Sequence, residues 1–431
     1  MWNLLSAAIR VYTIPYLPSS WQKSLAERRV IQTVQDAYRN VPFYQEKYDS
    51  AGVDIRLIRR LEDLKKLPLL TKEEVRRHYP GKIIKPGTDT DKCHHSSTLG
   101  STGKPLSFIF SPQAYAYYLA ESARIYTMIG YRPWYRSCYI RYLPMQLLPV
   151  SRSRQTYIWS MQPVDKIIAD LRMVKPDLID AYASNMLEIA RNVTVDDLRY
   201  IRPRMITVNS EMSSAEEREY IAGVFGCPVY DEYSTEETWG IAAQCRRHNY
   251  HIFTDSVWLE FLNEKGGDSA PGEAGEIIIT TTRNRAMPFI RYLVGDRGRP
   301  GGRTCGCVNN LPLMESIEGR SSDWLILPSG RPFEPERILS VIARIVKQHP
   351  LLFDEFKVVQ QRKDLIVLQY SRGRQFEPGP LEEILEALRT LIYEPVMVKA
   401  EEGKPARGAK RQAMESWVTR DKAVLDSLDA R

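Results

Sequence analysis

The chain has 431 residues, enough for two or three domains, and 43% of them are hydrophobic, enough for large buried cores. A small disulfide scaffold and a disordered, collagen-like or low-complexity chain are therefore excluded. The net charge of +7 suits an anionic ligand such as a nucleotide, but the sequence shows no long basic run and no nucleic-acid-binding module. We expect a globular protein that does not bind nucleic acid.

The beginning of the chain is apolar over a short stretch only. Trp2–Ile9 is followed, and not preceded, by the basic residue Arg10, which is not the order of a secretory signal peptide. No stretch approaches the length of a membrane-spanning helix. Residues 1–18 can form an amphipathic helix that touches a membrane, but docking on the protein's own body is favoured. We predict a cytoplasmic protein without integral membrane contact.

The spacing of apolar residues predicts an α/β body. A helical pattern runs from residue 24 to about residue 51, and we expect Val41-Pro42 to end the helix in a turn. Thr71 and Glu74 form a capping-box pattern that predicts a second helix. Strands and helices then alternate. We expect strands at residues 104–111, 204–209, 257–262 and 276–282, and helices at residues 112–129, 163–175, 183–193 and 215–225.

The pattern changes between residues 318 and 330, where a glycine- and serine-rich stretch is followed by a short apolar run and a turn. This change indicates a domain boundary. The remaining hundred residues predict a compact domain with helices at 335–348 and 379–392 and strands near 355–360 and 364–370.

Ser96-Ser-Thr-Leu-Gly-Ser-Thr-Gly-Lys-Pro105 is the sharpest local signal. Its glycines let backbone N–H groups approach an anion, its hydroxyls donate further hydrogen bonds, and Lys104 adds positive charge, so the run suits phosphate. It is not a Walker loop, because the G-x4-G-K-[ST] spacing is absent and a strand is expected to follow. By itself the run fits a plain surface loop equally well.

Two further segments end in carboxylates. Tyr230–Glu236 gathers carboxylates and hydroxyls at the end of a predicted strand, where they can hold magnesium. Met287–Asp296 delivers Arg291, Tyr292 and Asp296 into a turn, where an aspartate can accept both hydroxyls of a ribose. Taken alone, the first segment also fits a solvated acidic loop, and the second is ambiguous.

Five segments together resemble, in sequence order, the core motifs of the adenylate-forming superfamily of acyl-CoA ligases: residues 98–105, 233–236, 291–296, 319–323 and 408–410. Val41–Tyr44 and Leu67–Lys72 add a similarity to the branch of phenylacetate–CoA ligases and their capsule-biosynthesis relatives. The similarity covers nearly the whole chain. It implies an α/β fold with a large multi-sheet N-terminal adenylation domain, residues 1–322, and a small mobile C-terminal α+β lid, residues 323–431.

The resemblance implies a role for each matching residue. Tyr233 matches the aromatic residue against adenine, Asp296 the acceptor of the ribose hydroxyls, and Arg320 an arginine near the ribose and phosphate. Thr235 matches the donor to the α-phosphate, and Glu236 the magnesium ligand. The loop that holds the β- and γ-phosphates of ATP is matched by Thr98, Ser101, Thr102, Gly103 and Lys104.

The resemblance also assigns a catalytic lysine and a hinge. Lys410 matches the C-terminal lysine that bridges the attacking carboxylate and the α-phosphate, and Lys404 is the alternative. Asp323 lies where the interdomain hinge is expected, so the lid would rotate between the two half-reactions.

The six cysteines do not resemble a secreted disulfide framework. Three thiolates and one imidazole would form a tetrahedral zinc site if the fold brings them together. They belong to Cys305-Gly-Cys307, Cys245 and His251. His248 competes with His251. Some members of the resembled branch carry a Cys/His zinc site in comparable positions, which adds to the expectation of a structural zinc ion.

The resemblance implies that a carboxylic acid attacks the α-phosphate of ATP, giving an acyl-adenylate and pyrophosphate, and that coenzyme A then accepts the acyl group. An amine acceptor is an alternative, and so is a non-catalytic nucleotide-binding scaffold. Loss of Lys410 or Glu236 would indicate a scaffold, and both are present. A homodimer is also left open.

The segment between the phosphate loop and Tyr233 is expected to form the acyl pocket. Its aromatic residues permit an aryl acid, although such residues are more often part of a core. Leu99 and Ser234 stand where the superfamily usually has a small residue and glycine, which leaves altered chemistry open. The aromatic residues are Tyr126, Tyr131, Trp134, Tyr135, Tyr139, Trp159 and Tyr182.

Overall fold

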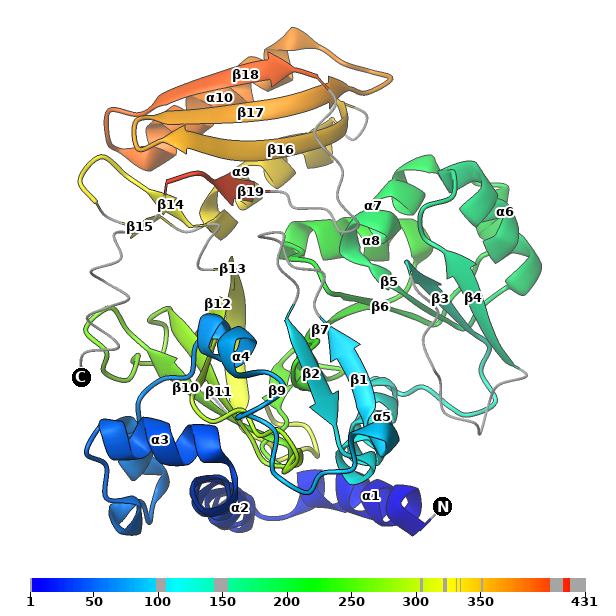
Figure 1. The fold of residues 1–431 in the computed structure, drawn as a ribbon. Helices are drawn as coiled ribbons and strands as arrows, with labels where there is room; N and C mark the ends of the chain where they lie inside the picture. Colours follow the sequence, from blue (N-terminus) through cyan, green and yellow to red (C-terminus); the bar gives the residue numbers. More distant parts are fainter. Residues whose placement is uncertain are drawn as a thin grey trace. The chain divides into compact units, whose positions relative to one another are not determined.

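Figure 1 shows the computed structural model of the chain. The structure describes residues 2–97, 106–142, 154–302, 305–320, 324–330, 332–333, 335–349, 352–403 and 414–418. The described chain divides into two compact units. Unit 1 consists of the residues up to Gly130 and of Glu232–Ile317, and unit 2 of Tyr131–Asp231 and the described residues from Glu318 on.

Unit 1 begins with a layer of helices. Pro42 is the first residue of α3. A proline is tolerated there because the N–H groups of the first helical turn have no partner within the helix, so α3 can begin one residue after α2 ends. The capping box of Thr71 and Glu74 opens α4. The elements are α1 (Trp2–Thr13), η1 (Ile14–Tyr16), α2 (Ser19–Asn40), α3 (Pro42–Ser50), η2 (Ile55–Leu57), η3 (Leu61–Lys66), α4 (Lys72–His78), η4 (Thr90–Lys92) and α5 (Pro112–Met128).

The strands of unit 1 form a mainly antiparallel sheet in the order β10-β11-β12-β13-β9-β8-β7. Strands β1 and β2 form a separate antiparallel pair, and residues 98–106 lie between them in the sequence. The bounds are β1 (His94–Ser97), β2 (Ser107–Phe110), β7 (Val229–Thr235), β8 (Trp239–Gln244), β9 (Tyr250–Ile252), β10 (Val257–Leu262), β11 (Gly275–Thr281), β12 (Tyr292–Pro300) and β13 (Leu313–Arg320). Strand β7 begins in unit 2, and β13 ends there.

A buried ion network joins α5 to the turn before β10. The Arg124 guanidinium donates to the Asp255 carboxylate at 2.9 Å and to Glu121 at 2.9 Å, and all three side chains are almost fully buried. Burial raises the pKa of Glu121 to about 8. Arg124 also donates to the Val11 carbonyl oxygen of α1, so the network holds the N-terminal helix as well.

The first part of unit 2 is a parallel sheet with helices packed on one face (Figure 1). Alternate strand residues such as Ile179 and Val208 pack against the helices in one hydrophobic core. The elements are β3 (Ser137–Arg141), β4 (Gln155–Trp159), α6 (Val164–Val174), β5 (Leu178–Tyr182), α7 (Ala183–Asn192), η6 (Asp197–Arg199), β6 (Met205–Asn209) and α8 (Ala215–Phe225).

The C-terminal part of unit 2 has a core of its own, formed between α9 and α10 and the sheet β18-β17-β16-β19. The apolar residues of α10, such as Ile384 and Leu388, repeat at helical spacing and are fully buried. The elements are β14 (Leu325–Ile326), β15 (Pro332–Phe333), α9 (Pro335–Gln348), β16 (Phe353–Arg362), β17 (Leu365–Arg372), α10 (Pro378–Ile392), β18 (Met397–Glu402) and β19 (Met414–Ser416).

Most of the elements expected from the sequence are confirmed within a few residues. The predicted bounds of β10, α8 and α9 are those of the structure. The prediction of a turn after Val41 was wrong, because Pro42 is the first residue of helix α3. The mixed α/β class is confirmed, while the proposed domain boundary after residue 322 stays a prediction.

We expect Asp255→Asn to destabilise unit 1 strongly. The amide keeps the shape of the side chain but leaves the buried Arg124 charge without its main partner, which should cost about 3–5 kcal/mol of unfolding free energy. Urea unfolding measures the loss. Asp364→Asn is the control, because that residue pairs with Arg362 in solvent, and it should change stability little. An equal stability of the two variants would contradict a structural role for the network.

Candidate functional site

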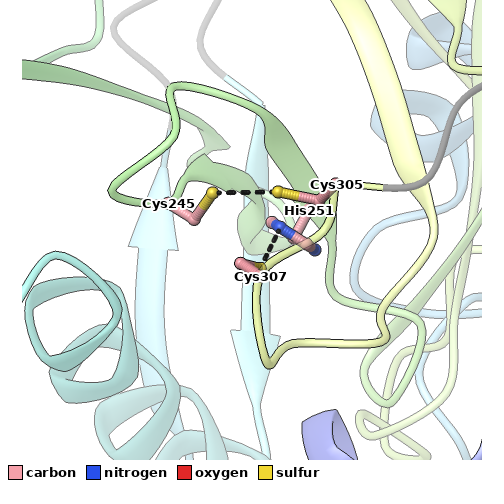
Figure 2. A group of neighbouring side chains, drawn as sticks. All are labelled: Cys245, His251, Cys305 and Cys307. Atoms are coloured by element: carbon pink, nitrogen blue, oxygen red, sulfur yellow. Dashed lines mark hydrogen bonds between the residues drawn. The ribbon is translucent and has the colours of Figure 1, made fainter.

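Three thiols and one imidazole of unit 1 converge at one point (Figure 2). The ligand atoms of Cys245, His251, Cys305 and Cys307 all lie within 4.8 Å of one another. Cys245 Sγ lies 3.4 Å from Cys305 Sγ, and Cys307 Sγ lies 3.4 Å from His251 Nε2. The ligand atoms of a tetrahedral zinc site lie about 3.5–3.8 Å apart, so the group has nearly the size that zinc requires.

Local backbone geometry builds this cluster from two hairpin connections. Cys245 begins the turn between β8 and β9, and His251 follows on β9. Cys305 and Cys307 lie in the connection from β12 to β13, where Gly306 takes a positive φ of 66° that favours glycine. Because β8, β9 and β13 are neighbours in the sheet, the two connections meet at the same edge.

The hydrogen bonds around the cluster prepare its atoms as metal ligands. His251 is fully buried, and its Nδ1 donates to the Leu311 carbonyl oxygen at 3.1 Å, which leaves Nε2 facing the thiols. The backbone N–H of Arg247 donates to Cys245 Sγ, and that of Asn309 to Cys307 Sγ, both at 3.4 Å. Such donors stabilise thiolates, the form that binds metal.

The protonation state of His251 also favours metal binding. Burial lowers the pKa of His251, so the ring is neutral and its Nε2 lone pair is available. Burial raises the pKa of Cys245 and, to about 11, that of Cys307. Burial opposes ionisation of Cys305 as well, but hydrogen bonds from the Cys245 and Cys307 thiols lower the pKa of Cys305 below its ordinary value. His248 is exposed and is not part of the group.

A second site forms where the turn between β7 and β8 meets β12. The Tyr233 hydroxyl donates to Asp296 Oδ2 at 2.8 Å, although the two residues are 63 positions apart in the chain. Tyr233 is buried on β7, next to a bulge between Tyr233 and Ser234, and Asp296 is half-buried on β12. The structure therefore brings together two of the residues that the sequence analysis assigned to adenine and ribose.

The two carboxylates that follow Tyr233 differ in burial. Glu236 is exposed, whereas Glu237 is buried and accepts a hydrogen bond from the Tyr292 hydroxyl at 2.8 Å. Lys72 Nζ lies 4.0 Å from the same Glu237 oxygen. Thr235 Oγ1 lies 2.8 Å from Thr238 Oγ1. Glu237 was not predicted as a site residue, because only its adjacency to Glu236 distinguishes it in the sequence.

Several predicted site residues fall outside this arrangement. Arg320 is the exposed last residue of β13, in unit 2. Lys410, its alternative Lys404 and Asp323 lie outside the residues that the structure describes. The same holds for the whole phosphate-loop set, Thr98, Ser101, Thr102, Gly103 and Lys104, whose connection is flanked by β1 and β2.

Unit 2 carries a buried polar group on the face of its sheet that is turned away from the helices. Arg141 donates to Asp180 and to Asn209, and Thr207 Oγ1 donates to Asp180 at 2.8 Å. The Arg141 guanidinium lies 5.0 Å from the centre of the Tyr182 ring. Of its members only Tyr182 was singled out from the sequence, because the polar side chains come from three separate strands and form no local pattern.

The residues that follow strands β5 and β6 are joined to each other next to this group. The backbone N–H of Ser184 donates to Glu211 Oε2 at 2.9 Å.

Of the aromatic residues considered for an acyl pocket, Tyr126, Tyr139 and Tyr182 are buried, whereas Trp134 and Trp159 are exposed.

The chain is similar in sequence to phenylacetate–coenzyme A ligases and to protein CapK. It is 26% identical over 359 residues to a phenylacetate–coenzyme A ligase of Thermus thermophilus, across 78% of this chain and 79% of that protein. It is 22% identical over 319 residues to protein CapK of Staphylococcus aureus, across 67% and 65% of the two chains. No family model matches the chain.

The fold is that of solved acyl-CoA ligases. The crystal structure of 2-hydroxyisobutyryl-CoA ligase in its postadenylation state, with an acyl-AMP bound, superposes with a TM-score of 0.78 at 19% identity. The match covers 97% of this chain and 94% of that one. The expected resemblance to the adenylate-forming superfamily, in the branch of phenylacetate–CoA ligases and CapK, is thereby confirmed. Within the described residues, no helix is both long and apolar enough to cross a bilayer.

Proposed function

We propose that this chain, an adenylate-forming ligase of the phenylacetate–CoA ligase branch, activates a carboxylic acid with ATP and transfers the acyl group to coenzyme A. A carboxylate oxygen attacks the α-phosphorus of ATP, and pyrophosphate leaves. The thiol of coenzyme A then attacks the acyl carbon and AMP leaves. The observation that carries the proposal is the hydrogen bond from Tyr233 to Asp296.

That hydrogen bond supports a nucleoside site. The ring of Tyr233 can pack on adenine while its hydroxyl holds Asp296 in a fixed orientation, and the carboxylate of Asp296 can accept the ribose hydroxyls. The enzyme has little covalent work to do, so orientation of the nucleotide supplies much of the catalysis. Arg320 is proposed to add charge near the ribose and phosphate.

The phosphates are proposed to lie at the loop between β1 and β2, which carries Lys104. Magnesium would be held by a carboxylate of the β7–β8 turn, and Thr235 would donate to the α-phosphate. Glu236 is exposed and is our proposed ligand; the neighbouring Glu237 is the rival, because its buried carboxylate lies beside Lys72 and Tyr292. When bound, the ion neutralises phosphate charge and favours departure of pyrophosphate.

Residues 323–431 are proposed to be a mobile lid that turns about Asp323 and brings Lys410 to the α-phosphate. A lysine there can bind the attacking carboxylate and the α-phosphate at once and so stabilise the charge of the transition state. Support comes from the separate hydrophobic core of the C-terminal part, which needs no residue before Leu325.

The Cys245, His251, Cys305 and Cys307 group is proposed to bind one structural zinc ion. All four positions of a tetrahedral ion would be filled by protein atoms, so the ion would tie the two connections together and take no part in the reaction.

Lys410→Ala should lower carboxylate-dependent release of pyrophosphate from ATP by about 100-fold or more, because the transition state loses a positive charge. The assay uses a panel of aryl and aliphatic acids without coenzyme A, and calorimetry should show nearly unchanged ATP binding. Lys404→Ala is the matched control and should keep activity within about twofold.

A larger loss in Lys404→Ala would move the catalytic role to that residue. Tight ATP binding by the wild type without pyrophosphate release for any acid would contradict the proposed function and indicate a nucleotide-binding scaffold. Adenylate formation that only an amine consumes would change the acceptor and leave the first step intact.

Glu236→Gln should raise the magnesium concentration that gives half-maximal pyrophosphate release by about tenfold or more, because a carboxylate is lost from a hard-cation site. Glu237→Gln is the matched variant, one residue away. If Glu236→Gln titrates like the wild type and Glu237→Gln does not, magnesium is bound by the buried carboxylate and our assignment is wrong.

Cys305→Ser should remove zinc from the purified protein, as measured by elemental analysis, and lower the melting temperature. Chelator treatment of the wild type should cause a similar fall. Cys93→Ser is the control: that thiol lies outside the group and donates to the Asp89 carbonyl oxygen, a bond that serine can keep. Wild-type protein that contains no metal would refute the zinc proposal.

A further inference from the structure

Helix α1 is apolar on two sides. Its inner side packs on α5, where Ala7 and Val11 form a buried cluster with Tyr117 and Ala120. This contact confirms that the N-terminal segment docks on the protein's own body. A helix that only covered its own core would be polar on its outer side.

The outer side of α1 carries large apolar side chains instead. Leu5, Ile9 and Tyr12 are spaced by four and three residues, so they form one stripe along the helix. The chain continues with further exposed aromatic residues, Tyr16 in η1 and Trp21 in α2. The exposed fractions are 56% for Leu5, 56% for Ile9, 37% for Tyr12, 57% for Tyr16 and 66% for Trp21.

Such a stripe needs an explanation. Single exposed apolar residues are ordinary, but a contiguous row of them marks a contact surface. Tyrosine and tryptophan are also the residues that favour the boundary between water and lipid, since their rings are apolar and their polar atoms can stay hydrated.

The segment that carries the stripe has basic residues and no acidic ones. The chain has no aspartate or glutamate before Glu27. Arg10 and Lys23 are exposed, and Ser6, Arg10 and Thr13 form a polar side of α1 next to the stripe. This arrangement of an apolar stripe beside basic residues without acids complements an anionic surface.

More arginines lie next to α1. The Arg29 guanidinium donates to the Asp255 carbonyl oxygen at 3.2 Å, and that of Arg283 lies over the Tyr117 ring at 3.6 Å. Burial first, and then the nearby Arg283 and Arg10, lower the pKa of Arg29 to about 10. Arg29 and Arg283 therefore lie at the inner side of α1, beside the buried Asp255 and Tyr117, and Arg10 is the cation that α1 carries next to the stripe.

The size of the stripe argues against a second copy of the chain as its partner. A 12-residue helix is about 18 Å long and 10 Å wide, so its outer side offers on the order of 200 Å². A stable protein interface buries about 800 Å² on each partner. A bilayer has no such requirement, because a few side chains that enter the headgroup region, together with basic residues, suffice for reversible binding.

We propose that the outer side of α1, with Tyr16 and Trp21, binds the surface of an anionic lipid bilayer. Leu5 and Ile9 enter the lipid boundary, the aromatic residues lie at headgroup level, and Arg10 contacts lipid phosphates. The protein then acts as a peripheral membrane protein whose body stays in water. This inference concerns a surface separate from the nucleotide site and does not depend on the proposed reaction.

Sedimentation with vesicles tests the proposal. The wild-type protein should pellet with vesicles of equal parts phosphatidylcholine and phosphatidylglycerol and much less with pure phosphatidylcholine. Leu5→Ser combined with Ile9→Ser should lower the partition coefficient by about tenfold or more, since two apolar side chains leave the lipid. Arg10→Gln should lower it about fivefold on anionic vesicles only.

Controls separate the proposal from a loss of folding. Met173→Ser combined with Val195→Ser removes two apolar side chains of 75% and 79% exposure elsewhere on the surface and should bind vesicles like the wild type. Both double variants should keep the wild-type melting temperature and pyrophosphate release. Pyrophosphate release that fails in every form, with vesicle binding intact, would overturn the proposed function and leave this inference standing.

Three results would overturn the membrane proposal. The first is a wild-type protein that stays in the supernatant with anionic vesicles, and the second is an equal loss of vesicle binding in the two double variants. The third is a wild-type dimer by light scattering that Leu5→Ser combined with Ile9→Ser converts to a monomer, without vesicle binding in either form. The stripe would then be a subunit interface.

Discussion

Two hydrogen bonds, one from the end of β7 and one to the β7–β8 turn, join this region to β12 and are the constraint on which the proposed nucleotide site depends. Tyr233 donates to Asp296, and Tyr292 donates to Glu237. Strands β8, β9 and β13 stand between β7 and β12 in the hydrogen-bonded order, so the sheet must curve for these side chains to meet. The curvature of the sheet therefore brings an aromatic ring and carboxylates from two segments that are distant in sequence into one site.

At their other ends, strands β8 and β12 lead to the cysteine and histidine group. Strand β8 follows the β7–β8 turn and ends at Gln244, next to Cys245, and β12 runs from Tyr292 toward Cys305 and Cys307. A metal ion bound there would fix the ends of these strands that lie away from Glu237 and Tyr292. On another side, the buried Arg124 network ties α5 and α1 to the turn before β10. Rigid support at both places is what a site that works by orientation requires.

Local signals predicted local structure well. The helix at Pro335–Gln348 and the capping box at Thr71 follow from apolar spacing and side-chain hydrogen bonding over a few residues. The four metal-ligand candidates were predicted because cysteine pairs and histidine are scarce and chemically distinctive, and burial then separates His251 from the exposed His248. Glu237 and the Arg141 group could not be predicted, since burial of a carboxylate or guanidinium depends on partners from distant strands. Helix α3 was missed because a proline that ends one helix can also begin the next.

The central claim is that a carboxylate oxygen attacks the α-phosphorus of ATP. The most direct measurement uses an acid labelled with oxygen-18 in its carboxylate, with ATP and coenzyme A, and mass spectrometry of the products. The account predicts one labelled oxygen in AMP, because the oxygen that attacks the α-phosphorus stays with it when coenzyme A displaces AMP. Unlabelled AMP, or label in inorganic phosphate together with ADP, would contradict it.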